Sequence, residues 1–174
     1  KPRHIAALMI TVTPPSTLKW NGRIFSCVLG WNGVTSDKWE GDGCTPAGTY
    51  TLRKVFYRKD SVTALKTSLP KHPITKSDGW CDDPEHSLYN MLVQLPIEAS
   101  HEKLWREDNC YDIVVAVGHN DTKIIPYRGS AIFMHVVAPD RHPTEGCVAL
   151  DLLALTTILA GCDPDEKIHI QVAT

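Results

Sequence analysis

The sequence predicts a mainly β fold with one good α-helix and short helical pieces. Asn21-Gly22 joins two apolar runs, Thr17–Trp20 and Arg23–Leu29, and this dipeptide is the strongest short signal for a β-hairpin. Further apolar or alternating runs, separated by turn residues, lie at 5–12, 49–58, 111–118, 129–135, 146–150 and 167–172. Strands of this length and spacing indicate a sheet-based domain.

One helix is expected, over 151–161. Asp151 is the candidate N-cap and Gly161 the candidate C′ residue. The side chains expected on its buried face are Leu152, Leu155, Ile158 and Leu159.

Two further segments carry local predictions. Ser100–Arg106 is expected to be a short helix, with Ser100 as its cap and Glu102 and Arg106 as an i, i+4 pair. Its His101 and Arg106 are candidates for binding substrate carboxylates, and a purely structural helix is the alternative. Residues 49–58 are expected to be a regular strand with Tyr50, Leu52, Lys54 and Phe56 on one face.

The loops contain turn formers and carboxylates. Gly41–Gly48 lacks the ending and the following helix of a phosphate-binding loop, so we expect a rigid turn. Asp82 and Asp83 follow a long irregular stretch and are expected to be turn or cap carboxylates, since adjacent residues of an extended chain point to opposite faces. Trp80, Asp82 and Asp83 are candidates to line a cleft, with Tyr89 and Asn90 close behind.

Composition sets limits on function. The 174 residues, with 43% hydrophobic and 22% charged, are expected to form a single domain over 1–174. The net charge of −2 argues against a basic surface for nucleic acid or anionic membranes. No apolar run is long enough to cross a bilayer. The chain opens on Lys1 without an initiator methionine, so we expect a mature chain whose targeting segment is not in this sequence.

The six cysteines fit no zinc ribbon or knuckle spacing. Cys44 and Cys110 lie in turn-like contexts and are the candidates for a disulfide, with all thiols reduced as the alternative. No metal or cofactor is expected. A zinc site from His135, His142 and Cys147 is a rival, although the sequence has no Cys-x-x-Cys or His-Glu-x-x-His pair.

The stretch Gly129–Leu150 has the residue types of a covalent catalyst. An apolar run ends in His135, and after a polar loop the chain returns as Gly146-Cys147-Val148. A free thiol is mostly protonated near neutral pH, and a histidine within hydrogen-bond reach can take its proton. Gly146 lets the backbone turn sharply beside the sulfur, with the amides near Gly146 and Cys147 free to face an oxyanion. A structural thiol beside an ordinary strand histidine is the alternative.

Thr144-Glu145-Gly146-Cys147-Val148, preceded by His135, resembles the signature of the L,D-transpeptidase (YkuD-type) catalytic domain. Further similarity lies in three upstream blocks, at 41–48, 79–90 and 100–106, so the resemblance covers nearly the whole chain. It departs from the family pattern at Glu145, where a second histidine is usual, and at Ala149, where asparagine is common. The spacer between His135 and the Thr-Glu-Gly-Cys segment is also short.

The resemblance implies a β-sandwich-like fold with His135 and Cys147 at adjacent strand ends. It implies a cysteine acyltransferase of the cell envelope or periplasm, which cross-links peptidoglycan stem peptides through a thioester. Cys147 would be the nucleophile and His135 the base, oriented by the carbonyl of Val136, with Gly146 beside the oxyanion. The sequence does not decide whether the first or the third residue of the stem peptide is the acyl donor.

The other candidates for substrate binding are Arg141, His142, Tyr127, Trp80, Asn90 and Ser130. Glu145 is expected to pair with Arg141, since a carboxylate facing the thiol would disfavour its thiolate. A hydrolase of the same chemistry and a non-catalytic wall-binding module are the alternative functions, and the protein is expected to be a monomer.

Overall fold

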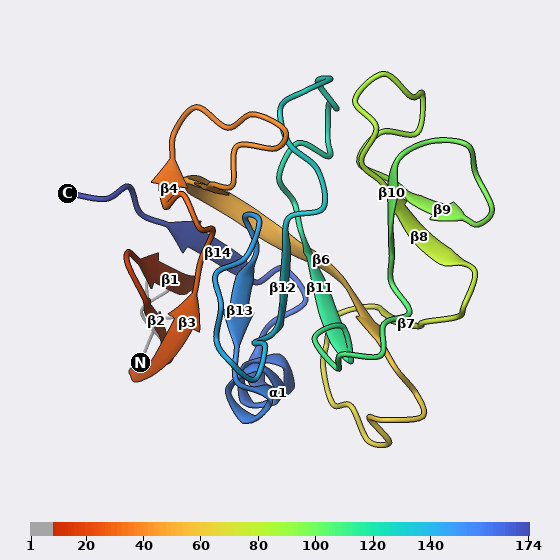
Figure 1. Ribbon diagram of the computed structural model, residues 1–174. Helices are drawn as coiled ribbons and strands as arrows, with labels where there is room; N and C mark the ends of the chain where they lie inside the picture. Colours follow the sequence, from red (N-terminus) through yellow and green to blue (C-terminus); the bar gives the residue numbers. More distant parts are fainter. Residues whose placement is uncertain (1–8) are drawn as a thin grey trace.

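The computed structural model describes residues 9–174, and it confirms the mainly β class (Figure 1). A large nine-stranded sheet has the order β11-β12-β13-β3-β2-β1-β14-β6-β7, and β11 pairs in addition with β6. Strand β6 pairs with both β14 and β11, so the sheet curls into a sandwich and β6 connects its two halves. The first four residues of the expected strand 5–12 lie outside the described part.

The strands of the first half of the sandwich match those expected from the sequence. It contains β1 (Met9–Thr13), β2 (Thr17–Trp20), β3 (Arg23–Val28) and β14 (Lys167–Ile170). Asn21 and Gly22 have φ of 49° and 73°, the left-handed backbone that a tight hairpin turn needs. The hairpin prediction is therefore confirmed.

The second half holds the segment that the sequence singles out. It contains β6 (Gly48–Tyr57), β7 (Lys71–Pro73), β11 (Ile113–Val117), β12 (Phe133–Val136) and β13 (Val148–Leu150). β12 and β13 run parallel, with Met134 opposite Val148 and His135 opposite Ala149. Two short strands, β4 (Val34–Thr35) and β5 (Thr45–Pro46), form a separate two-stranded sheet.

Strand alternation separates two cores. Val115, Met134 and Val148 point between the two halves, into the main core. Phe133 and Cys147 point outward, into a second cluster of buried side chains. Over this outer face stands a separate three-stranded sheet of β8 (Asp78–Cys81), β9 (Leu92–Gln94) and β10 (His101–Lys103), seen at the right of Figure 1.

Strand β6 departs from the alternation expected from the sequence. Leu52 and Val55 are both buried in the main core, whereas Lys54 is exposed. The pairing with β11 advances three residues on β6, from 52 to 55, against two on β11, from 117 to 115. The extra residue is a β-bulge, which shifts the buried face by one position and bends the strand that joins both halves.

The one helix is confirmed as α1 (Leu152–Gly161), with three details changed. Asp151 occupies the N-cap position but makes no capping hydrogen bond, because its carboxylate accepts from Arg141 at 2.9 Å. Gly161 is the last helical residue rather than C′. Leu152 is 46% exposed and Ala154 is buried instead, so the buried face is rotated from the expected one.

The second expected helix is wrong. Residues 101–103 form β10, which pairs antiparallel with β8, His101 opposite Cys81 and Lys103 opposite Gly79. Ladder hydrogen bonds to a strand far away in the chain outweigh the weak local preference of this short segment for a helix. In residues 9–174 no helix other than α1 forms, so the expected short helical pieces are absent there.

All six cysteines are free and buried, so the suggested Cys44–Cys110 disulfide is wrong. No helix among the described residues is long and apolar enough to cross a membrane.

Candidate active site

Cys147 and His135 share the outer face of the sandwich. His135 on β12 lies opposite Ala149 on β13, and Cys147 precedes Ala149 by two residues. Since side chains alternate along a strand, Cys147, Ala149 and His135 point the same way. Neighbouring strands lie about 5 Å apart and two residues span about 7 Å, so the thiol and the imidazole lie within reach of each other. Both line one cavity of about 180 Å³.

The imidazole of His135 has a defined tautomer. Its Nδ1 lies 2.8 Å from the carbonyl oxygen of Val136, and because a carbonyl only accepts, Nδ1 carries the proton. The residue is 9% exposed, and burial lowers the pKa of His135, although the Val136 carbonyl opposes this. Tyr111 packs edge-on against it with ring centroids 5.3 Å apart. At neutral pH His135 is therefore uncharged, with Nε2 as its basic atom.

The thiol of Cys147 is held by backbone groups. Its Sγ donates to the carbonyl of Ala131 at 3.3 Å and accepts from the amide of Phe133 at 3.4 Å. Burial, and next the charge of Glu102, raise the pKa of Cys147 to about 12, while the Phe133 amide lowers it. Among the described residues the sulfur does not hydrogen-bond His135, so the resting pair is a neutral thiol beside a neutral imidazole.

Gly146 is required by close packing. It has φ of 143°, and a Cβ here would lie 2.7 Å from the carbonyl oxygen of Cys44. The Gly41–Gly48 turn thus packs directly behind the nucleophile. The amide of Gly146 donates to Thr144 Oγ1 at 3.1 Å, and the same hydroxyl donates to the carbonyl of Cys147 at 2.7 Å. The expectation that the Gly146 amide is free for an oxyanion is therefore wrong.

Two cavities meet at Cys147, and both contain Glu102 and Glu145 in their walls. We call the one that contains His135 the histidine lobe; it is lined by Glu102, Arg106, Cys110, Tyr111, His135, Ala138, His142, Pro143, Thr144, Glu145, Cys147 and Ala149. We call the other, of about 170 Å³, the acidic lobe; it is lined by Lys38, Glu40, Gly41, Asp82, Glu102, Ser130, Ala131, Ile132, Glu145, Gly146 and Cys147.

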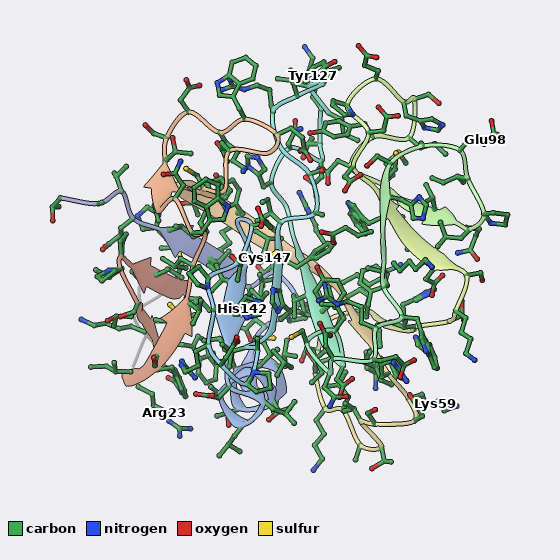
Figure 2. All side chains as sticks on the ribbon, viewed as in Figure 1. Arg23, Lys59, Glu98, Tyr127, His142 and Cys147 are labelled. Atoms are coloured by element: carbon green, nitrogen blue, oxygen red, sulfur yellow. The ribbon has the colours of Figure 1, made fainter. Side chains whose placement is uncertain are left out.

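Three residues expected to bind substrate do lie in these lobes or next to them. His142 lines the histidine lobe, with its Nδ1 2.5 Å from Asp140, and Figure 2 places it on the same side of the molecule as Cys147. Ser130 lines the acidic lobe and donates to Glu40 at 2.9 Å. Arg106 lines the histidine lobe, where its guanidinium pairs with Asp108 and lies over the Tyr111 ring.

Four other candidates lie elsewhere. Arg141 pairs with Asp151 and lines a different cavity. Tyr127 is 43% exposed at the top of Figure 2, where its hydroxyl donates to Glu85 at 2.8 Å. Trp80 and Asn90 line another cavity, and the Trp80 ring packs edge-on against Phe133 with ring centroids 5.1 Å apart.

Asn90 has a structural role. Its amide oxygen accepts from the Trp80 indole and from the amide of Ala131, and its nitrogen donates to the carbonyls of His119 and Asn120. All of its hydrogen-bonding capacity is used within the protein, which leaves none for a substrate. One ring nitrogen of His101 is also used within the protein, because Nδ1 bonds the carbonyl of Ala99 at 2.8 Å.

The expected pairing of Glu145 with Arg141 is wrong. Glu145 accepts instead from the indole Nε1 of Trp31 at 3.0 Å, and the guanidinium of Arg141 is held by Asp151 and Ser26. Asp83 accepts from the amide of Glu85 at 3.0 Å, as expected of a turn carboxylate, whereas Asp82 accepts from Ser100 Oγ, 18 residues along the chain, at 2.6 Å. Asp82 also lines the acidic lobe.

Sequence reasoning did not select Tyr111, Glu40 or Glu102 as site residues. Tyr111 donates to Glu102 Oε2 at 2.9 Å, while Tyr89 donates to Glu40 at 2.6 Å. Burial raises the pKa of both carboxyls, against the hydroxyl donors that lower it. The three residues stand on separate segments with no shared motif, so only the folded structure brings them together.

Among residues 9–174 no group of three or more His, Cys, Asp and Glu side chains is arranged to hold a metal ion. The rival zinc site of His135, His142 and Cys147 therefore has no ligand set in the described structure.

The sequence matches the L,D-transpeptidase catalytic domain, YkuD, over residues 10–170. The chain belongs to this family. The β-rich fold is consistent with this family, whose members act on peptidoglycan.

Among solved structures the chain is similar to the helical cell shape determining protein Pgp2 from Campylobacter jejuni, with 14% identity and a TM-score of 0.47. The similarity covers 95% of this chain and 48% of that chain, so the present sequence spans about half the length of that relative. No curated protein matches the sequence significantly.

Proposed function

We propose that the protein is a peptidoglycan L,D-transpeptidase in the cell envelope that works through a thioester on Cys147. The observation that carries this proposal is the placement of Cys147 and His135 on one face of adjacent parallel strands, in the wall of one cavity. The family supplies the reaction class.

In the first step the thiol turns from the Ala131 carbonyl toward His135, and Nε2 takes its proton. Sγ attacks a peptide carbonyl of the donor stem, the C–N bond breaks, and the leaving amine takes the proton from Nε2. The product is a thioester on Cys147. Because the resting thiol has a pKa of about 12, proton transfer accompanies attack rather than preceding it.

In the second step an acceptor amine attacks the thioester carbonyl. Nε2 of His135 takes a proton from this amine and returns it to the departing sulfur, so a new amide forms and the thiol is restored. The Val136 carbonyl holds the ring in the tautomer that both steps need. Of the two expected amide donors, that of Cys147 is the candidate for the oxyanion, because Thr144 occupies the other.

Mass spectrometry of purified muropeptides incubated with the protein tests this function. We expect cross-linked dimers with wild type and none with Cys147→Ala, whose fold is checked by circular dichroism. The position of the new amide identifies the donor residue, first or third in the stem. Shortened monomers without dimers would replace the transpeptidase by a hydrolase, and no product at all would favour a binding module.

A further inference from the structure

Lys38 is a buried lysine in the wall of the acidic lobe. The residue is only 6% exposed, which is rare for a lysine, and its aliphatic stem packs against Gly129. A Cβ at Gly129 would lie 3.0 Å from Cγ of Lys38. Close packing therefore fixes this side chain beside Cys147, which lines the same cavity of about 170 Å³.

Hydrogen bonding leaves part of the Lys38 ammonium free. Its partner is Asp42, whose carboxylate also accepts from the amides of Trp39 and Cys44. An ammonium has three donors, and among the described residues Asp42 is the one acceptor that it bonds. Of the two members of this pair, the described lining of the lobe includes Lys38 and not Asp42. Because unmatched buried donors of a charged group are costly, the remaining N–H groups indicate a place for an oxygen atom of a ligand.

The proposed chemistry needs a positive charge in this lobe. Addition of a thiol to a carbonyl places negative charge on the carbonyl oxygen, and the four carboxylates of the lobe wall disfavour such a charge. Lys38 is the one cationic side chain among the lining residues within 9–174. The amide of Gly146, one of the two donors expected for this oxygen, donates to Thr144 instead. An oxyanion formed here therefore lacks one expected donor, and Lys38 is the lining residue able to replace it.

We infer that Lys38 donates a hydrogen bond to the oxyanion that forms when the thiol of Cys147 adds to a substrate carbonyl. The inference rests on the proposed function, whose thioester forms through this addition. As the Sγ–C bond forms, the π pair of the carbonyl moves onto its oxygen, which accepts from Lys38 and from the amide of Cys147. When the C–N bond breaks, this pair returns to the carbonyl and the leaving amine takes its proton from His135. Lys38 keeps its own protons throughout.

The charge of Lys38 already acts on the nucleophile in the resting protein. Burial, and next the charge of Glu102, raise the pKa of Cys147 to about 12, whereas Lys38 lowers it and does so more than Arg106. Arg106 is in addition paired with Asp108. Lys38 is therefore the better placed of the two cations to stabilise negative charge at the reacting atoms.

Two neutral reagents separate oxyanion stabilisation from thiol reactivity. p-Nitrophenyl acetate acylates a thiol through an oxyanion, whereas iodoacetamide alkylates it by displacement of iodide and forms no oxyanion. We would measure both rates at Cys147, with Cys147→Ala as the blank, and take the ratio of acylation to alkylation. Because both reactions start from the same thiol, this ratio cancels changes in thiol ionisation and in the fraction of folded protein.

Three variants isolate the contribution of the ammonium. Lys38→Met should lower the ratio about 100-fold, which is the loss typical of one oxyanion donor. Asp42→Asn breaks the same ion pair but keeps the ammonium, so its ratio should stay close to that of wild type. The double variant Lys38→Met with Asp42→Asn leaves no buried carboxylate without its partner, which protects the fold, and it should show the same loss as Lys38→Met. Circular dichroism checks the fold of each variant.

Two results would overturn the inference. One is a wild-type ratio in Lys38→Met or in the double variant, and the other is an equal loss in Asp42→Asn and the double variant, because the ion pair would then only brace the loop. Acylation of Cys147 in wild type without cross-linked muropeptides would count against the proposed function and leave the role of Lys38 in place. Cross-linking by wild type together with an unchanged ratio in Lys38→Met would do the reverse.

Discussion

Gly146→Ala should destabilise the protein strongly, because two separate costs fall on one residue. The backbone has φ of 143°, a region that is essentially confined to glycine and costs a side chain about 1–3 kcal/mol. The new Cβ would lie 2.7 Å from the Cys44 carbonyl oxygen, and relieving such crowding in a packed site costs about 1–3 kcal/mol more. We expect a total of about 2–6 kcal/mol.

Urea unfolding and calorimetry measure this loss. For a chain of 174 residues, each kcal/mol shifts Tm by about 2–4 °C, so the variant should melt roughly 10 °C lower. Gly41→Ala is the matched control. It also has positive φ, 77°, but a Cβ there meets nothing within 4 Å, so only the backbone cost of about 1–2 kcal/mol applies. Equal losses for the two variants would show that the Cys44 contact does not support the nucleophile.

The other predictions concern charge and hydrogen bonding around the site. Burial lowers the pKa of His135, so the folded state binds fewer protons than the unfolded state, and stability should fall as pH drops below about 6.5. Urea unfolding midpoints measured from pH 7.5 to 5.5 check this. The dependence of the midpoint on pH should be weaker in His135→Asn. Asn90→Ala should lower the free energy of unfolding in urea by about 2–4 kcal/mol and leave the KM of the remaining folded protein unchanged. A selective rise in KM would indicate instead that Asn90 binds substrate. Arg141→Gln removes an exposed pair with Asp151 and should cost at most about 1 kcal/mol without altering thiol alkylation, and a changed alkylation rate would refute this.

Local sequence signals predicted the elements that depend on local physics. The Asn21-Gly22 turn and the apolar spacing of the helix were sufficient for β2, β3 and α1. The order His135, loop, Gly146-Cys147 was sufficient to select the residues that meet on one face. In each case the signal lies within a few residues of the feature it predicts.

Long-range pairing decided the features that the sequence could not predict. β10 exists because His101–Lys103 pair with β8, and the bulge in β6 follows from its pairing with β11. The four carboxylates of the acidic lobe come from four separate segments, at positions 40, 82, 102 and 145, and no spacing rule connects them. For the same reason the partner of Glu145 proved to be Trp31, 114 residues away.

The central claim of the proposed function is that Cys147 is the one nucleophile of this protein. Incubation with a carbapenem, an acylating agent directed at active-site thiols, followed by intact-mass measurement and peptide mapping, tests it most directly. We predict one adduct, on Cys147, whose formation is lost in Cys147→Ala and greatly slowed in His135→Asn. Adducts spread over Cys27, Cys81 and Cys162, or a rate that is unchanged in His135→Asn, would contradict the account.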